Sequence, residues 1–129
     1  MNRIKALKPS LREKKRYLAF EIISKVKIKG FSVVRDAIAD CLTVFLGTQE
    51  SSQAGLIILK ERYDQSKQRG IIKISHKYVD KLRASFCFIE KIDGQKVIVR
   101  SIGTSGILKK AHERYILNNN QKNSTEKPN

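Results

Sequence analysis

Short apolar runs alternate with polar segments along the chain, and their spacing predicts both strands and helices. YLAFEIIS at residues 17–24 is rich in aromatic and branched side chains, which predicts a strand. Apolar residues then recur at helical spacing, which predicts a helix with Ser32 as its N-cap and Gly47 at its C-terminal end. The residues expected to face inward in this helix are Val34, Ala37, Ile38, Cys41, Leu42, Phe45 and Leu46.

The middle of the chain predicts a β-hairpin and a second helix. LIILKERY at 56–63 and GIIKIS at 70–75 are expected to pair as antiparallel strands, after a polar loop at 48–55. Ser75 is placed to cap the second helix. Its inward positions are predicted to be Tyr78, Val79, Leu82 and Phe86.

The last third predicts two further strands and a helix. FCFIEKI and QKVIVRSI flank Asp93-Gly94, a dipeptide favoured in two-residue hairpin turns. A final helix is expected from about Ser105 to Leu117, with Ile107, Leu108, Ala111, Tyr115 and Ile116 facing inward. The order of elements predicts an α+β fold, in which an antiparallel sheet of four to five strands packs with helices. This is a ferredoxin-like or RRM-like sandwich with an extra C-terminal helix.

Length and composition predict one domain between two polar ends. A chain of 129 residues with 40% apolar side chains can bury an adequate core. Residues 1–16 hold seven basic side chains and one acidic one, which predicts an extended basic arm, or simply a solvated tail. The α+β domain is expected over 17–117, and residues 118–129 have little to bury, which predicts a disordered tail. No stretch has the length of a membrane span or the pattern of a signal peptide, so a cytoplasmic protein is expected.

The charge of the chain points to a polyanionic partner, because 27 Lys and Arg against 12 Asp and Glu leave a net charge of +15. Basic residues cluster in the arm and again at 100–115, where glycines and hydroxyl residues precede a basic helix. The N-terminus of such a helix suits a phosphate, although an ordinary capped helix with solvated lysines has the same sequence pattern. The candidate RNA-binding residues are Lys8, Arg12, Lys14, Lys15, Arg16, Arg100, Gly103, Thr104, Ser105, Gly106, Lys109, Lys110 and Arg114.

Residues that could support catalysis do not converge in the sequence. His76 and His112 lack the spacing of metal ligands, and Cys41 and Cys87 lie in apolar runs, where they are expected to be buried. We therefore predict no catalytic residue, no bound metal and no cofactor in this chain.

Two nucleic-acid or phosphate sites of small α+β proteins match the sequence poorly. The loop SKVKIKG at 24–30 supplies lysines but a single glycine, which is a weak match to the anion loop of an acylphosphatase. Ile71, Ile72 and Ile74 stand where an RRM uses aromatic residues to stack bases. Contact with phosphates and with the shape of folded RNA remains as the predicted mode of binding.

LREKKRYLAFEIIS at 11–24 and VDKLRASFCFIEKIDGQKVIVRSIGTSGILKKA at 79–111 resemble the archaeal ribonuclease P protein component 2 family. The resemblance runs from about Leu7 to Leu117, and it matches Gly103–Gly106 to a family turn that precedes a basic helix. Ile107 departs from the Thr expected after that turn, which removes a hydroxyl group that could cap the helix or contact a phosphate.

The resemblance implies a protein subunit of the ribonucleoprotein endonuclease that removes 5′ leaders from precursor tRNA. It implies that the RNA subunit performs the hydrolysis with bound Mg²⁺, while the protein supports the catalytic domain of that RNA. The implied partners are the RNase P RNA, protein component 3 in a heterodimer that can pair into a heterotetramer, and other RNase P proteins. No membrane or small-molecule substrate is implied.

Two alternatives to this function stay open at this point. The charge and fold class also fit a general RNA-binding or ribosome-associated scaffold, and a small nuclease that cuts RNA alone is a further alternative. A separate prediction concerns the sheet, because Tyr17, Ala19 and Ile23 alternate with the residues expected to face the helices. If helices cover only one face, the other is apolar and the isolated chain is expected to self-associate.

Overall fold

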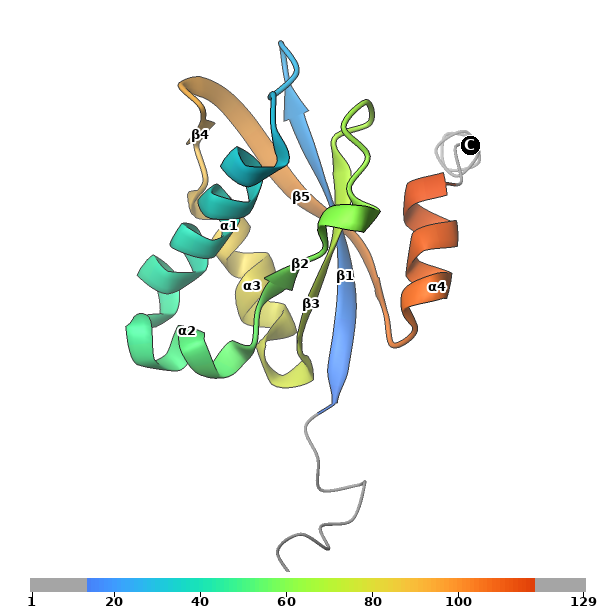
Figure 1. Ribbon diagram of the computed structural model, residues 1–129. Coiled ribbons are helices and arrows are strands. Elements are labelled where there is room, and N and C mark those ends of the chain that lie inside the picture. The colour runs from blue at the N-terminus through green and yellow to red at the C-terminus, as the bar shows by residue number, and fades with distance from the viewer. Residues whose placement is uncertain (1–13, 118–129) are drawn as a thin grey trace, which may run out of the picture.

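The computed structural model describes residues 14–117, which form a five-stranded antiparallel sheet with helices on both faces (Figure 1). The strands are β1 (Lys15–Ser24), β2 (Ile57–Ile58), β3 (Arg69–Ser75), β4 (Lys91–Ile92) and β5 (Gln95–Ser105), in the order β2-β3-β1-β5-β4. The helices are α1 (Phe31–Leu46), α2 (Thr48–Ala54), α3 (Val79–Ser85) and α4 (Leu108–Ala111), which continues as the π-helical segment η6 (His112–Leu117). The predicted α+β, ferredoxin-like fold is confirmed.

Strand β1 lies at the centre of the sheet because its residues are apolar on both sides. Leu18 and Phe20 point toward α1 and α3, whereas Ala19 points toward α4, and all three are fully buried. The pairing of β1 with β5 shifts register between Ala19 and Phe20. A central strand covered on both faces has no need of a polar side, which explains this continuous apolar run. The strand also begins earlier than predicted, at Lys15, so the end of the basic block is part of the sheet.

The larger core lies between the sheet and helices α1 and α3. Val34, Ile38 and Leu42 are buried at the helical spacing that the sequence predicts, and Gly47 ends α1 as expected. The residue at the N-cap is Gly30 rather than Ser32, and Phe45 is 39% exposed rather than inward.

The second predicted helix forms with the expected cap, because the Ser75 hydroxyl accepts a hydrogen bond from the Lys77 backbone N–H. A short 3-10 segment, η4 (His76–Tyr78), precedes α3. Leu82 and Phe86 are buried, and Tyr78 and Val79 pack against the core with part of their surfaces exposed.

Several connecting segments differ from the sequence predictions. The predicted loop at 48–55 is helix α2 from Thr48 to Ala54, with Gly55 as its C-cap and Ala54 as its buried residue. Strand β2 is much shorter than predicted, and the chain then turns through η3 (Lys60–Arg62). FCF forms the 3-10 segment η5 (Phe86–Phe88), which leaves Cys87 exposed and shortens the expected strand to β4. The hairpin at Asp93-Gly94 is confirmed, with positive φ angles of 55° and 81°.

Helix α4 and η6 cover the middle of the other face of the sheet. Ala111, Tyr115 and Ile116 pack against Ala19 and Ile71, and all five are buried. The condition considered above, that helices cover only one face of the sheet, therefore does not hold for this part of the sheet. Gly103 lets the helix approach, because a Cβ at this position would lie 2.4 Å from the Tyr115 hydroxyl oxygen.

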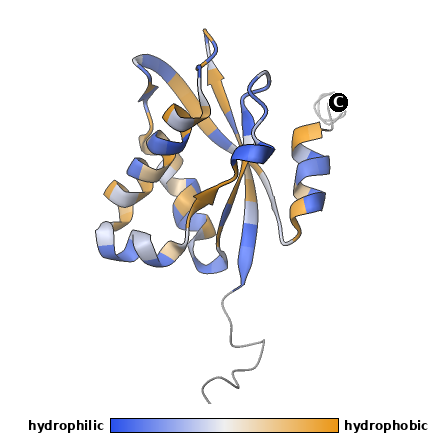
Figure 2. Ribbon diagram, in the orientation of Figure 1, coloured by the Kyte–Doolittle hydropathy of each residue, from blue (hydrophilic) through white to orange (hydrophobic). Residues whose placement is uncertain are grey.

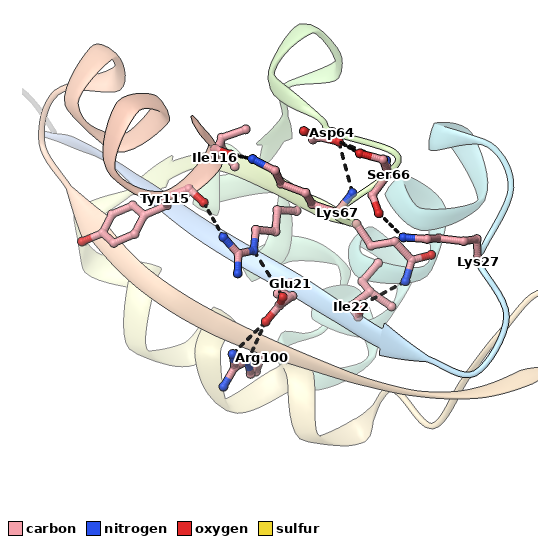
Figure 3. A network of polar contacts seen from close by, with 11 residues as sticks. Glu21, Ile22, Lys27, Asp64, Ser66, Lys67, Arg100, Tyr115 and Ile116 are labelled. Carbon is pink, nitrogen blue, oxygen red and sulfur yellow. Dashed lines mark hydrogen bonds and ion pairs between the residues drawn. The ribbon is translucent and has the colours of Figure 1, made fainter. Parts of the chain in front are cut away.

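Basic side chains from the sheet side bind the carbonyl end of this helix (Figure 3). Arg69 donates to the Tyr115 carbonyl at 3.2 Å, and Lys67 donates to the Ile116 carbonyl at 2.6 Å. The last carbonyls of a helix lack intrahelical partners and carry a partial negative charge, so both contacts stabilise the docked position.

Candidate nucleic-acid interface

The fold brings two of the predicted basic clusters to one end of the molecule. Strand pairing places Tyr17 opposite Ser105, so the start of β1 lies beside the turn that leads into α4. The Arg16 guanidinium reaches that turn, because a Cβ built on Gly106 would lie 3.5 Å from Arg16 Nη1. The first residues of β1 are hydrophilic in Figure 2. We refer to Lys14, Lys15, Arg16, Lys109 and Lys110 as the basic end.

The segment η4, which follows β3, adds a basic residue to this end that no local sequence pattern reveals. The His76 backbone N–H donates to the Lys14 carbonyl at 2.8 Å, and Lys15 pairs with Ser75. Lys77, which is exposed in η4, therefore follows directly after the contact with β1. Only the pairing of β1 with β3 reveals this neighbour, because the two segments are far apart in the chain.

The predicted GTSG turn is mostly strand. Gly103 to Ser105 continue β5 and pair with β1, so only the residues after Ser105 turn toward α4. The Ser105 hydroxyl accepts a hydrogen bond from the Ile107 N–H at 3.1 Å, and it therefore supplies a hydroxyl contact at the entrance to the helix. Ile107 itself is 53% exposed rather than inward. The glycine at 103 has a packing explanation, and α4 alone is too short to offer a strong helix dipole.

The cations of the basic end form no ion pair with the acidic residues that the structure describes. Within residues 14–117, no carboxylate forms an ion pair with a side chain of the basic end or with Arg114, which lies exposed on η6. Unpaired lysine and arginine side chains on a rigid surface are the groups that contact phosphates. The basic end can therefore receive a polyanion without first breaking an ion pair to any carboxylate within residues 14–117.

Arg100 differs from the other candidate residues because it is already paired. Its guanidinium lies 2.8 Å from Glu21, and the same carboxylate also binds Arg69 at 3.2 Å (Figure 3). Burial alone would raise the pKa of Glu21, but the hydrogen bonds and charges of Arg100 and Arg69 outweigh it and lower that pKa below its ordinary value. Arg100 is thus partly neutralised and lies away from the basic end. Lys8 and Arg12, the other candidate residues, lie outside the described residues.

The described part of the chain also bears on other kinds of site. Residues 14–117 contain no group of three or more His, Cys, Asp or Glu side chains placed to hold a metal ion. No helix in that range is long and apolar enough to cross a membrane.

Burial and the charge of Arg62 lower the pKa of His112, whose Nδ1 is buried without a hydrogen-bond partner among these residues. Burial raises the pKa of Cys41, which donates to the Ser85 carbonyl.

The fold and the basic end define a small α+β protein with a surface suited to a polyanion. A model of the Rpp14/Pop5 family matches residues 16–116, and the chain belongs to this family.

Curated archaeal proteins named ribonuclease P protein component 2 are similar over most of the chain. The identity to the protein of Methanosarcina barkeri is 37% over 115 residues, which covers 89% of this chain and 82% of that relative. The protein of Thermococcus kodakarensis is 32% identical over 112 residues, covering 87% and 91%. The protein of Pyrococcus horikoshii is 30% identical over 119 residues, covering 90% and 94%. The resemblance drawn from the sequence is confirmed.

A solved structure supports the same fold. A chain in the cryo-EM structure of yeast ribonuclease MRP aligns with a TM-score of 0.58, covering 88% of this chain and 94% of that chain. The sequence identity is 13%, so this likeness concerns the fold alone.

Proposed function

We propose that this protein is a non-catalytic subunit of ribonuclease P and binds the RNase P RNA through the basic end. Its membership of the Rpp14/Pop5 family and its similarity to archaeal component 2 proteins support the assignment. The observation on which the RNA contact rests is the set of unpaired cations that β1 and α4 hold side by side. Cleavage of the 5′ leader of precursor tRNA then belongs to the RNA, with Mg²⁺ bound by the RNA.

The physical role follows from the rigid placement of charge. An RNA catalytic domain brings phosphates close together, and their repulsion opposes the compact active fold. Cations fixed on a sheet and its attached helix reduce that repulsion without the entropy cost of ordering a flexible chain. The protein therefore lowers the Mg²⁺ concentration that the RNA needs for activity. In the complete complex, protein component 3 and the other RNase P proteins are its further partners.

Reconstitution of leader cleavage with and without this protein tests the role. We expect the Mg²⁺ concentration for half-maximal cleavage to fall when the protein is present. An unchanged Mg²⁺ requirement would contradict the mechanism, and cleavage by the purified protein alone would show a stand-alone nuclease. Copurification with ribosomal subunits, in place of an RNA that cleaves precursor tRNA, would favour the scaffold alternative.

Charge reversal locates the RNA surface. Lys109→Glu with Lys110→Glu should weaken binding to RNase P RNA and reduce the slope of log K against log salt by roughly 0.7–0.9 for each phosphate that the protein no longer neutralises. Lys91→Glu with Lys96→Glu is the matched control, because these two exposed lysines pair across the hairpin at the other end of β5 and change the net charge equally. Equal losses in both double variants would mean that RNA binding follows net charge and not the basic end.

A further inference from the structure

At the end of β5 remote from the basic end, the surface is apolar and hollowed. A groove of about 1060 Å³ runs between η5 with β4 on one side and β5 with the end of β1 on the other. Its apolar lining includes Ile23, Phe86, Cys87, Ile89, Val97 and Ile98. Ile23 and Ile98 oppose each other across the strands and are 46% and 61% exposed. Apolar surface of this kind, open to water, is characteristic of an interaction site.

The groove lies along a strand edge that is open. Strand β4 pairs with only the first two residues of β5, and the Val97 N–H donates to the Glu90 carbonyl at 3.0 Å. Beyond Val97, no other segment within the described range bonds to the outer backbone edge of β5. Because backbone groups alternate sides along a strand, Val99 and Ser101 present their N–H and C=O groups outward. An edge of this kind accepts an added strand.

The rim of the groove is basic. Lys25, Lys91 and Lys96 line it, with Glu90 as the acidic residue among its lining side chains, and Arg100 follows along β5. A ligand that fills the groove thus meets apolar side chains in the centre and positive charge at the border.

We infer that this groove binds an extended segment of a partner protein, with alternating apolar side chains flanked by acidic residues. The backbone of the segment pairs with the outer edge of β5, and every second side chain enters the apolar groove. Acidic flanks complement Lys25, Lys91 and Lys96 and speed association. The site goes beyond the proposed RNA role and does not depend on it.

Charge and composition argue against the other occupants. A second copy of the chain would bring its own net charge of +15 to the same basic rim. Residues 118–129 contain no Leu, Ile, Val, Phe or Met that could fill the groove. Residues 1–13 are strongly basic, and the chain enters β1 at Lys15, the end of that strand remote from the groove. RNA is a poor match because the apolar side chains that line the groove are mostly aliphatic, with Phe86 as the one aromatic residue among them, and bases stack on rows of aromatic side chains.

Selection from a library of short randomised peptides tests the inference on the full-length protein. We expect enriched peptides to alternate apolar residues between acidic flanks and to protect Cys87 from alkylation. Cys87 is the exposed thiol that lines the groove, whereas Cys41 is half-buried, so peptide mapping separates the two. Affinity of the selected peptides is then measured by fluorescence anisotropy.

Matched variants decide whether the peptides occupy the groove. Ile98→Asp should weaken peptide binding by about tenfold or more, because it removes an apolar contact and repels acidic flanks. Val44→Asp makes the same class of change at a side chain that is 84% exposed outside the groove, and it should leave the affinity unchanged. Lys91→Glu with Lys96→Glu should weaken the acidic peptides while RNase P RNA binding is retained.

Four outcomes would overturn the inference. In the first, the selection yields no peptide of this pattern. In the second, the peptides bind Ile98→Asp and the unsubstituted protein with equal affinity. In the third and fourth, Cys87 is protected from alkylation by structured RNA in place of peptide, or by self-association at high protein concentration. Loss of RNA binding in Lys109→Glu with Lys110→Glu has no bearing on the groove, so failure of the RNA role and failure of the docking site are distinguishable.

Discussion

Within residues 14–117, the core between the sheet and helices α1 and α3 contains seventeen buried apolar residues, whereas the core between the sheet and α4 with η6 contains five. The larger core supplies most of the hydrophobic stabilisation of the fold. The C-terminal helix has a smaller apolar contact and relies on Arg69, Lys67 and the absence of a side chain at Gly103. From this difference we expect that the C-terminal helix, which bears Lys109 and Lys110, unfolds locally at a lower free-energy cost than the sheet and the larger core.

Truncation in the larger core should give the largest effect. Leu82→Ala removes a side chain with 0% exposure and should lower the free energy of unfolding by about 2–5 kcal/mol. Denaturant titration followed by circular dichroism should show one cooperative transition at a lower midpoint. Val44→Ala, at an 84% exposed position, should change stability by less than about 0.5 kcal/mol. A similar small loss for Leu82→Ala would mean that this core contributes less than its burial indicates.

The next effect in size concerns the polar contact beneath the C-terminal helix. Arg69→Met leaves the Tyr115 carbonyl and one oxygen of Glu21 without their donor, which should cost about 1.5–3 kcal/mol. Hydrogen exchange should quicken first in residues 112–117. Arg35→Met removes an exposed ion pair with Asp36 and should cost less than about 1 kcal/mol. Equal losses in the two variants would contradict the role of Arg69 in docking.

Adding one carbon at the helix contact should weaken docking with little effect on the larger core. Gly103→Ala places a Cβ 2.4 Å from the Tyr115 ring, and the resulting displacement should cost about 1–3 kcal/mol. Amide exchange should quicken in α4 and η6 while β3 stays protected, and affinity for RNase P RNA should fall. Gly106→Ala is the matched control, because among the described residues its Cβ would meet the end of the flexible Arg16 side chain, with Nη1 at 3.5 Å and Cζ at 3.9 Å. Unchanged exchange in Gly103→Ala would show that the contact is not needed.

The smallest effect should come from the exposed member of the Glu21 cluster, and it should depend on pH. Arg100→Ala should cost about 0.2–1 kcal/mol at neutral pH, because the Arg100 side chain is 59% exposed. The pKa of Glu21 is lowered in the folded protein, so its ion pairs stabilise the fold fully above its ordinary pKa of 4.5 and are lost as pH falls through the lower folded-state pKa. The free energies of unfolding of Arg100→Ala and of the unsubstituted protein, measured as a function of pH, should therefore converge in acid. A constant difference across this range would exclude Glu21 as the cause.

The elements with long periodic patterns were predictable from the sequence. Helix α1 repeats apolar residues over several turns, and Asp93-Gly94 specifies a hairpin by its backbone preference. Shorter elements were missed because their pattern is weak. Helix α2 has little apolar periodicity, and Ala54 is its one buried residue. The 3-10 segment η5 interrupts the strand alternation that led us to expect a buried Cys87.

The site was only partly predictable because strand register is not encoded in any local pattern. The basic residues could be named from the sequence, but the neighbourhood of Arg16 and Gly106 depends on pairing between the two ends of the chain. The packing role of Gly103 depends on Tyr115 in the same way. Considered alone, the sequence of residues 103–106, with glycines beside hydroxyl residues, favours a phosphate-binding loop. Nothing in these four residues indicates that a helix packs against Gly103.

The length of strand β5 has a consequence for the positions of partners bound at its two ends. It runs from Gln95, beside the apolar groove, to Ser105, beside the basic end, with one shift in its register against β1 between Ser101 and Gly103. Eleven residues of strand span at most roughly 33 Å, and the register shift bends the strand and shortens this distance. Two macromolecules bound at the two ends of β5 would be held at a defined separation and orientation. Lengthening the strand by two residues would move one of them relative to the other by about 7 Å.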